Sequence, residues 1–477
     1  MKYFILSLTI LTGFTLKGQF SGYSLNQYQY GTLPGVDAKN FSSLYSRNIV
    51  QYSKDKWTIG STFETYVNPV NNRNYFKLTQ FNLKRYSKNA QLRIGNFFET
   101  LNRGLLLRSY EITGSIFQDR SYRSQYYFYK DFLGVTYLKK FNKWDLNLGL
   151  GSPLVNVFPP TKDLFVRRAD YLGFVTAKKK FKNNSLSITA LKQINKSNSN
   201  TFIELAEEGN IRPNLSYYIN YALNIQGENS TRPYAFYSNI NWNLKNINFS
   251  LEMKDYQNFS LGSGFNEPPA LIKQHTYRTL NRSTHVLEPL NEKGIQFETF
   301  ISLKNNNYLT ANYSWARNNI YHIYNYHEIF AEYVGSKNKK DYKIFFDFAM
   351  DPFKKEKQRV TFGGQINLPL VNKIRLEIDG EYQGFNRNDR VENQVFSLGL
   401  SHGSKYLLYW IAESTTDPFL TDTRKFYNGI GGNYKINSKV NLNLFLGRRR
   451  GGPACNGGIC YEVLDFKGFE MRTTIRI

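Results

Sequence analysis

Apolar and polar residues alternate one by one over many short stretches of this chain. In 469–477 the odd-numbered positions are Phe, Met, Thr, Ile and Ile, whereas the even-numbered positions are Glu, Arg, Thr and Arg. The same alternation recurs in 374–379 and in 440–446. Successive side chains of a β-strand point to opposite faces, so each stretch predicts a strand with one apolar and one polar face. Few stretches show the 3.6-residue period of a helix.

Two all-β architectures produce this pattern, and the lengths of the connections separate them. A soluble sandwich turns its apolar faces inward, whereas a membrane barrel turns them to lipid and lines its lumen with the polar faces. Counted back from the C-terminus, short connections such as Ile436–Lys439 and Leu244–Asn246 alternate with longer ones such as Ser414–Thr423 and Arg317–Tyr324. Short turns on one rim and longer loops on the other are typical of outer-membrane barrels. The sequence therefore predicts one transmembrane antiparallel β-barrel over residues 19–477.

The predicted barrel has about 22 strands, within a range of about 18 to 24, and an even number is expected for this class. Near the start of the mature chain the strand candidates are Ser21–Tyr30, Leu44–Tyr52, Trp57–Tyr66, Tyr75–Tyr86 and Gln91–Phe98. Aromatic residues near predicted strand ends suit the interfacial girdles of such barrels, although they also fit ordinary strands. They are Tyr66, Trp242, Trp315, Tyr382 and Trp410.

The first residues predict export from the cytoplasm. A basic Lys2 precedes an apolar run from Tyr3 to Leu16, and the small Gly18 follows. This pattern is typical of a secretory signal peptide, so we expect residues 1–18 to be cleaved. With the predicted barrel, it indicates the outer membrane of a Gram-negative cell. The expected partners are outer-membrane lipid, lipopolysaccharide and the barrel-assembly machinery, with a protein partner left open.

The positive charge of the chain does not indicate nucleic-acid binding. The net charge is +25, from 62 basic and 37 acidic residues, and the mean hydropathy is −0.50. The basic residues are spread over turns and loops instead of forming one stripe. An electropositive lumen or rim would attract anions, and phosphate-bearing lipid head groups explain the charge equally well.

Two long insertions, near 99–131 and 257–294, predict material that folds into the lumen. A barrel of this size encloses a wide lumen that is usually plugged. Both insertions mix charges with bulky apolar groups, and Leu105–Leu107 would not suit an exposed loop. We expect the two insertions to pair inside the barrel, so that thiols placed at 103 and 278 would crosslink; a surface lid is the alternative. The candidate plug residues are Glu99, Arg103, Arg108, Glu111, His275, Tyr277, Arg278 and Arg282.

Both cysteines lie in one loop near the C-terminus. Cys455 and Cys460 flank Asn-Gly-Gly-Ile, whose Asn-Gly-Gly favours a tight turn. In an oxidising compartment we expect a disulfide clip, with a redox pair and a metal site as weaker alternatives. The preceding Arg448, Arg449 and Arg450 predict an external basic patch, although a solvated charge run would look the same.

Three blocks of the sequence resemble a known family. They are RIGNFFETLNRGLLLRSYE at Arg93–Glu111, NEPPALIKQHTYRTLNRSTHVLEPLNEKGIQFE at Asn266–Glu298, and GRRRGGPACNGGICYEV at Gly447–Val463. The chain is similar over nearly its whole mature length to an uncharacterised family of secreted outer-membrane proteins from Bacteroidota, a domain-of-unknown-function family. The resemblance implies an outer-membrane barrel and supplies no activity or catalytic residue. The terminal Ile477 departs from the aromatic residue that ends many such barrels.

The sequence thus predicts a gated or plugged channel or transporter for small polar solutes, anions among them. The alternative is a non-transporting barrel that serves surface assembly, secretion or partner anchoring. Neither an enzyme, a cofactor nor a metal is predicted, because the five histidines lie in no recognised catalytic or metal spacing. A membrane-embedded hydrolase would need His275 or His285 to meet Ser283 in space.

Overall fold

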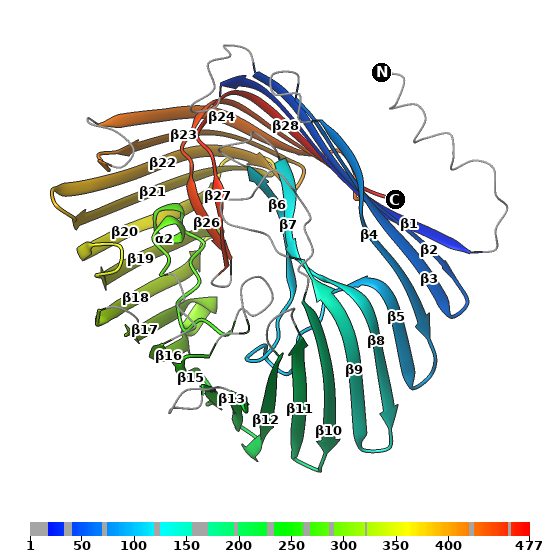
Figure 1. Cartoon of the computed structure of the whole chain (residues 1–477). Helices are drawn as coiled ribbons and strands as arrows, with labels where there is room; N and C mark the ends of the chain where they lie inside the picture. The colour runs from blue at the N-terminus through cyan, green and yellow to red at the C-terminus, as the bar shows by residue number, and fades with distance from the viewer. Residues whose placement is uncertain are drawn as a thin grey trace.

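Neighbouring strands pair around the whole molecule and close it into one barrel in the computed structural model (Figure 1). Each wall strand is antiparallel to its neighbours, and the first strand, β1 (Gln19–Thr32), pairs with the last, β28 (Phe466–Arg476). Closure leaves the wall without a free edge. The wall has 24 strands. The predicted all-β barrel is confirmed, with a strand number at the upper end of the predicted range.

The structure describes residues 18–32, 41–68, 74–118, 125–154, 170–194, 199–226, 233–259, 261, 268–285, 291–319, 322–418, 424–456 and 459–477. The expected signal peptide therefore lies almost entirely outside the described residues. Between β1 and β28 the wall consists of β2 (Phe41–Lys54), β3 (Trp57–Val67), β4 (Tyr75–Tyr86), β5 (Ala90–Phe97), β8 (Phe132–Phe141), β9 (Trp144–Pro153), β10 (Tyr171–Lys180), β11 (Asn184–Ile194), β12 (Ser199–Arg212), β13 (Leu215–Asn224), β14 (Tyr234–Asn243), β15 (Ile247–Gln257), β16 (Glu292–Ser302), β17 (Tyr308–Asn318), β18 (Tyr324–Lys337), β19 (Lys340–Asp351), β20 (Glu356–Pro369), β21 (Ile374–Asn386), β22 (Arg390–His402), β23 (Tyr406–Thr415), β24 (Lys425–Lys435) and β25 (Val440–Arg449).

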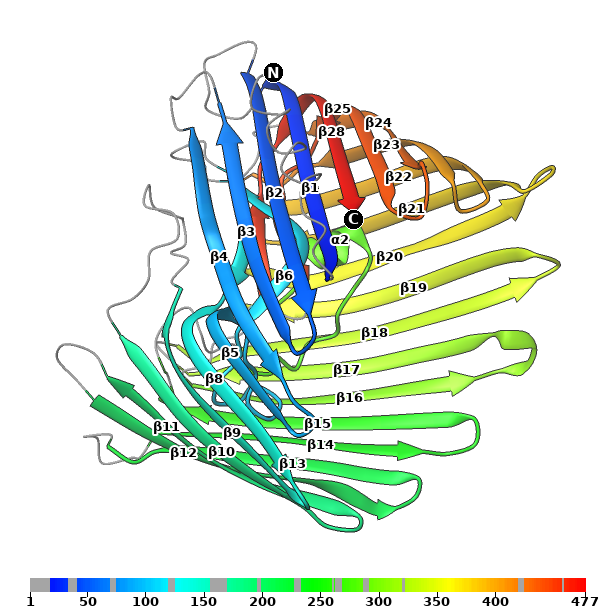
Figure 2. The ribbon, with the colours of Figure 1, turned by 90° about the vertical axis from the view of Figure 1, so that its right-hand side faces the viewer.

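The two rims of the barrel differ in the length of their connections, as the sequence predicts. The rim at which β1 begins and β28 ends has short turns, such as Asn338–Lys339 between β18 and β19. Both residues of this turn have positive φ, 53° and 63°, which matches the tight hairpin turn that follows strand twist. The opposite rim carries the longer connections, including those before β8, β16 and β28. Figure 2 shows the tilted strands running side by side between the two rims.

The outer face of the wall is apolar and the inner face is polar. Ile188, Ile344 and Leu446 point outward and are 52%, 61% and 61% exposed. Their strand neighbours face inward, where Ser187 and Phe345 are buried. A soluble barrel would show the opposite arrangement. The exposed aliphatic surface is the pattern that the sequence predicts for a wall in contact with lipid.

Three segments between wall strands fold into the barrel (Figure 1). Segment 1, residues 98–131, contains the hairpin of β6 (Tyr110–Gln118) and β7 (Gln125–Lys130). Segment 2, residues 258–291, contains the short helix α2 (Arg278–Arg282), and segment 3, residues 450–465, contains the hairpin of β26 (Gly452–Asn456) and β27 (Ile459–Val463). A 3₁₀ turn, η2 (Lys304–Asn306), links β16 to β17. No helix among the described residues has the length and apolar character needed to cross a membrane.

Candidate functional site

The inner wall carries charged side chains that are almost completely buried. Arg47, Glu64, Glu204, Asp347 and Arg359 are each at most 1% exposed. A charge held away from water is costly unless it is paired or hydrogen-bonded. These wall residues therefore require nearby polar groups, and the in-folded segments supply many of them. We treat the contacts between the wall and the three segments as the candidate functional site.

Arg47 of β2 joins the hairpin of segment 1 to the wall. Its Nη1 lies 3.0 Å from Glu111 Oε1 of β6, and its Nε lies 3.8 Å from Glu64 Oε1 of β3. The guanidinium also lies over the ring of Tyr127 in β7, 3.9 Å from its centroid. Glu64 in turn accepts a 3.2 Å hydrogen bond from the Tyr127 backbone N–H. One arginine thus ties both strands of the hairpin to the wall through charge and ring contacts.

The leucine-rich turn of segment 1 is held against a different part of the wall. Leu105, Leu106 and Leu107 are fully buried in an apolar cluster that includes Phe202 of β12 and Phe259 of segment 2. This burial explains the run of three leucines. Segments 1 and 2 contribute to the same cluster, so their expected association inside the barrel is found on the apolar side.

Polar contacts fix the rest of this turn. Asn102 donates a 2.8 Å hydrogen bond to Glu204 of β12, and Arg103 donates a 3.1 Å hydrogen bond to Asn239 of β14. The Arg103 guanidinium also lies 4.1 Å from the centroid of the Tyr218 ring in β13. Arg103 is therefore anchored to β13 and β14, far along the wall from the strands that hold Arg278. The predicted pairing of positions 103 and 278 is wrong, because each arginine binds its own part of the wall.

Helix α2 of segment 2 is attached to β21 and β23. Glu381 of β21 accepts hydrogen bonds from the backbone N–H groups of Arg278 and Thr279, at 3.0 and 2.8 Å, so a wall carboxylate caps the first turn. At the other end of α2, Arg282 Nη1 lies 2.7 Å from Glu413 Oε2 of β23. Arg278 reaches the same carboxylate at 3.6 Å. Two glutamates thus hold both ends of the helix.

The residues before α2 bind β18 and β19. His275 Nε2 lies 3.1 Å from Glu328 Oε1, and Tyr277 donates a hydrogen bond to Glu332. The Tyr277 ring stacks on Phe345 with centroids 3.6 Å apart. Burial and the hydrogen bond to Glu332 raise the pKa of Tyr277 above its ordinary range, so the phenol remains a donor. Segment 2 is therefore attached along the wall from β18 to β23.

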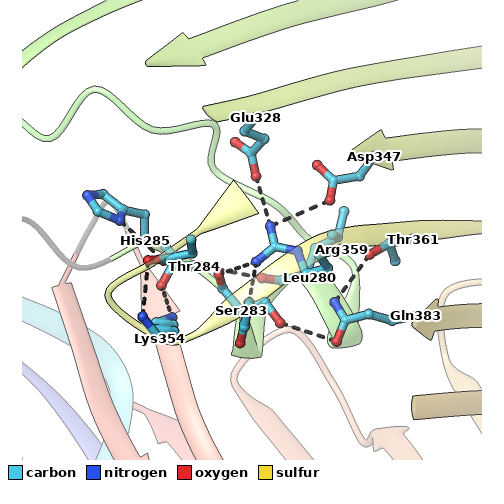
Figure 3. Close-up of polar contacts among 12 residues, drawn as sticks. Leu280, Ser283, Thr284, His285, Glu328, Asp347, Lys354, Arg359, Thr361 and Gln383 are labelled. Atoms are coloured by element: carbon cyan, nitrogen blue, oxygen red, sulfur yellow. Dashed lines mark hydrogen bonds and ion pairs between the residues drawn. The ribbon is translucent and has the colours of Figure 1, made fainter. Parts of the chain in front are cut away.

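Arg359 of β20 is the centre of the contacts that follow α2 (Figure 3). Its Nη1 donates a 2.9 Å hydrogen bond to the Ser283 carbonyl, and its Nη2 lies 3.4 Å from Glu328 and 3.5 Å from Asp347. Lys354 donates a 2.5 Å hydrogen bond to the Thr284 carbonyl. Burial lowers the pKa of Lys354 below its ordinary value.

The hairpin of segment 3 lies between the other two segments. β26 packs beside α2, and β27 packs beside β6. The Leu464 backbone N–H donates a 3.3 Å hydrogen bond to Gln118 of β6. Asp465 accepts a 2.5 Å hydrogen bond from the Gly451 backbone N–H, which closes the base of the segment. Segment 3 therefore connects segments 1 and 2 within the lumen.

The predicted external basic patch is wrong for two of its three arginines. Arg450 is buried and donates a 2.9 Å hydrogen bond to Asn393, while Arg449 forms a 3.1 Å ion pair with Glu470. Arg448 is exposed within the barrel, over the ring of Tyr427. The chain turns inward after β25, so these side chains meet the inner wall.

The other residues predicted from the sequence are Glu99, Arg108 and the two cysteines. Glu99 forms a 2.6 Å ion pair with Arg93 of β5, and burial raises its pKa although Arg93 opposes the shift. Arg108 is half-buried and forms a backbone bridge with Thr100. Cys455 lies opposite Cys460 in the backbone register of the hairpin. The structure describes the backbone of these two residues and not their side chains.

The wall partners of the segments are not evident from the sequence pattern. They are Arg47, Glu64, Glu204, Glu328, Glu332, Asp347, Arg359, Glu381 and Glu413. The available signal was a charge on the polar face of an alternating strand. Many strands carry such charges, and a strand pattern does not say which charge meets an in-folded segment.

One group in this region has donors that would suit a metal. His275, Glu328 and Asp347 place one ligand atom each within 4.8 Å of one another. Arg359 lies beside both carboxylates and already supplies a positive charge there. Ser283 donates to Gln383 of β21 at 3.2 Å, and His285 Nδ1 lies 3.3 Å from Asp351. Ser283, His275 and His285 therefore each contact a residue of the wall strands, and these contacts help to attach segment 2.

Comparisons with known proteins give only remote likenesses. Neither a family model nor a curated protein sequence matches this chain. Among solved structures, the chain is similar to OpdL from Pseudomonas aeruginosa, with 12% identity, a TM-score of 0.41, and 73% of this chain and 94% of that chain covered. A BenF-like porin from Pseudomonas fluorescens Pf-5 has 11% identity and a TM-score of 0.41, covering 81% and 99%. The P pilus usher PapC translocation pore has 10% identity and a TM-score of 0.44, covering 96% and 99%.

Proposed function

We propose that this protein is an outer-membrane β-barrel in which three in-folded segments form the gate of a channel for small polar solutes. The apolar outer face supports the membrane location, because such a surface is stable against acyl chains and unfavourable in water. Insertion by the barrel-assembly machinery, contact with lipopolysaccharide and cleavage of residues 1–18 belong to the same proposal. So does membership in the Bacteroidota family, which the three sequence blocks support.

The channel proposal depends on how segment 2 is attached to the inner wall. Apart from the leucine cluster and the packing of Tyr277 on Phe345, its attachments are ion pairs and hydrogen bonds to the inner wall, above all to Glu381 and Glu413. Polar contacts of this kind exchange with water more readily than a continuous apolar core. A segment attached in this way fits a movable gate.

Planar-bilayer recording of the purified protein tests the proposal. We expect rare, brief openings for the wild type and frequent openings for the double variant Glu381→Gln/Glu413→Gln, which removes the negative charge of both side chains that hold α2 and so weakens these contacts. Asp341→Asn is the matched control, because this half-exposed carboxylate at the short-turn rim pairs only with Arg375 among the described residues. Equal conductance of the double variant and the control would contradict a gate at α2.

The second candidate is a barrel that does not transport and serves surface assembly, secretion or partner anchoring. The three mutually connected segments favour it, since β6, β7, α2, β26 and β27 all lie inside the ring of wall strands in Figure 1. It predicts that both the wild type and the double variant stay silent in the bilayer. It also predicts that a specific protein co-purifies from native membranes.

A further inference from the structure

A hollow in the inner wall lies beside α2 and shares some of its lining with the attachments described above. Its volume is about 110 Å³. It lies among β23, β24, β25 and β28, and Arg278 of α2 forms part of its lining. The charged lining residues are Arg278, Arg448, Arg449, Glu413 and Glu470.

The two carboxylates of this hollow are already engaged. Glu413 is bound by Arg282 at 2.7 Å and by Arg278 at 3.6 Å. Glu470 accepts hydrogen bonds from Arg449 at 3.1 Å and from Gln29 at 2.8 Å. The hollow therefore has little capacity left to attract a cation.

Arg448 is the guanidinium that remains available. It lies 5.0 Å from the centroid of the Tyr427 ring, is exposed, and forms no ion pair with any residue that the structure describes. Arg278 is also half-exposed on the same hollow, and its contact with Glu413 is long. Two planar, fork-shaped donors thus face one small space, a geometry that suits carboxylate and phosphate groups.

Two more arginines, Arg282 and Arg450, lie near these groups. Arg282 and Arg450 lie close enough to influence each other, and burial together with Arg282 lowers the pKa of Arg450 to about 10. Burial is the larger of these two causes, and the nearby Arg282 guanidinium adds to it. Arg282 and Arg450 do not line the hollow and add only to the positive charge around it.

Three glycines cross the wall next to Arg448. Gly447 of β25 is paired with Gly429 of β24 and with Gly468 of β28, so a row of residues without side chains crosses three strands. Gly447 has a φ of 140°, and a Cβ atom there would lie 2.3 Å from the Asn428 carbonyl oxygen. The pairing of β24 with β25 ends at this glycine, and Arg448 then turns over Tyr427.

We propose that this hollow binds a compact oxyanion, a small carboxylate or a phosphate, between Arg448 and Arg278. Its volume is far below the ~300–1,000 Å³ of pockets for drug-sized ligands, which restricts the ligand to a few heavy atoms beyond the anionic group. Tyr409, Tyr427 and Phe445 line the same space and favour a ligand with a short apolar portion. The binding site stands on its own geometry, and only its assignment to the transported solute rests on the proposed function.

Titration calorimetry on the full-length protein in phosphatidylcholine nanodiscs tests the binding site. The probes are succinate and inorganic phosphate. We expect Arg448→Gln to weaken the affinity for both by about tenfold, as expected for the loss of a charge-assisted contact. Lys405→Gln removes the same charge at a short turn on the opposite rim and should bind like the wild type. Heat-modified migration in gel electrophoresis checks that every variant is folded.

Three results would overturn this assignment. One is equal affinity of the wild type and Arg448→Gln, and the second is equal weakening by Lys405→Gln, which would indicate a general charge effect. The third is a loss of succinate and phosphate binding when phosphatidylglycerol is placed in the nanodisc, which would indicate a lipid head-group site. Conductance is measured separately, so a silent barrel that still binds succinate would refute the channel while leaving the site intact.

Discussion

Arginine side chains make many of the contacts between the wall and the in-folded segments. Arg47 and Arg359 belong to the wall and reach into segments 1 and 2, whereas Arg103 and Arg282 belong to the segments and reach the wall. The planar guanidinium offers five donors, so one residue can satisfy several buried acceptors at once. Removing such a residue leaves more than one acceptor without its partner.

At this scale we predict that Arg47→Met releases the hairpin of segment 1. Glu64 and Glu111 would lose their cation in a buried site, which typically costs about 3–5 kcal/mol. Hydrogen exchange of the β6 and β7 amides measures the opening free energy. Arg85→Met is the control, because Arg85 is exposed and lies over Trp57. Unchanged exchange in β6 and β7 would show that Arg47 does not hold the hairpin.

A second residue-scale prediction concerns pH. Burial alone would lower the pKa of His285, but its contacts with Asp351 and Glu292 raise it above the ordinary value. A raised pKa in the folded state means that the stabilisation is fully present below about pH 6.5 and is lost as the pH rises through the raised value. The difference in urea midpoint between the wild type and His285→Gln should therefore shrink as the pH rises. His402→Gln, at the short-turn rim away from segment 2, is the control for the general effect of losing a histidine.

Short elements carry the connections inside the barrel. The leucine turn fills an apolar part of the inner wall, while α2 has five residues and depends on the Glu381 carboxylate to cap its first turn. A helix of this length has little stability of its own. The leucine turn and α2 therefore need the wall to keep their folded conformation. A substitution on either side of a contact should loosen the attachment of the segment to the wall.

For the leucine turn, we predict that Leu106→Ala increases local opening of segment 1. Truncating a fully buried leucine typically costs about 2–5 kcal/mol, through lost burial and the cavity that remains. Amide exchange over residues 99–109 reports this loss. Ile188→Ala truncates an outward-facing aliphatic side chain and should leave that exchange unchanged.

For the hairpin of segment 3, we predict that Cys455 and Cys460 form a disulfide, since they are opposite each other in the backbone register. Mass spectrometry of alkylated protein, with and without prior reduction, counts the free thiols. The ring is small, so Cys455→Ser/Cys460→Ser should lower the free energy of unfolding by less than about 3 kcal/mol. Two alkylated cysteines in the unreduced protein would contradict the clip.

At the scale of the whole molecule, exposed aliphatic and aromatic side chains recur on wall strands around the barrel and make its outer surface apolar. This surface predicts that Leu205→Arg, near the middle of β12, destabilises the barrel in lipid by about 2–4 kcal/mol. Leu370→Arg, in the turn between β20 and β21, should cost at most about 1 kcal/mol because it lies near the interface. Refolding into vesicles at different urea concentrations measures both values. Equal costs would mean that the face at Leu205 does not contact lipid.

The alternating pattern was sufficient for the barrel because it acts locally along each strand. The same pattern left the strand number uncertain, since connections as short as Pro213–Asn214 leave no clear gap between two strands. A different signal, the run of three leucines at Leu105–Leu107, predicted a buried turn, because three adjacent leucines are unfavourable in water.

The sequence by itself determined the closed sheet, the two faces of its wall, the two rims and the infolding of the long insertions. Each of these follows from the order of apolar, polar and turn-forming residues along a short stretch. Only the tertiary structure decided which charges meet: Arg47 with Glu111, α2 with Glu381, and Arg449 with Glu470. Those partners are far apart in the sequence or on different strands, and pairing depends on the barrel register and on where the inward turns bring the chain.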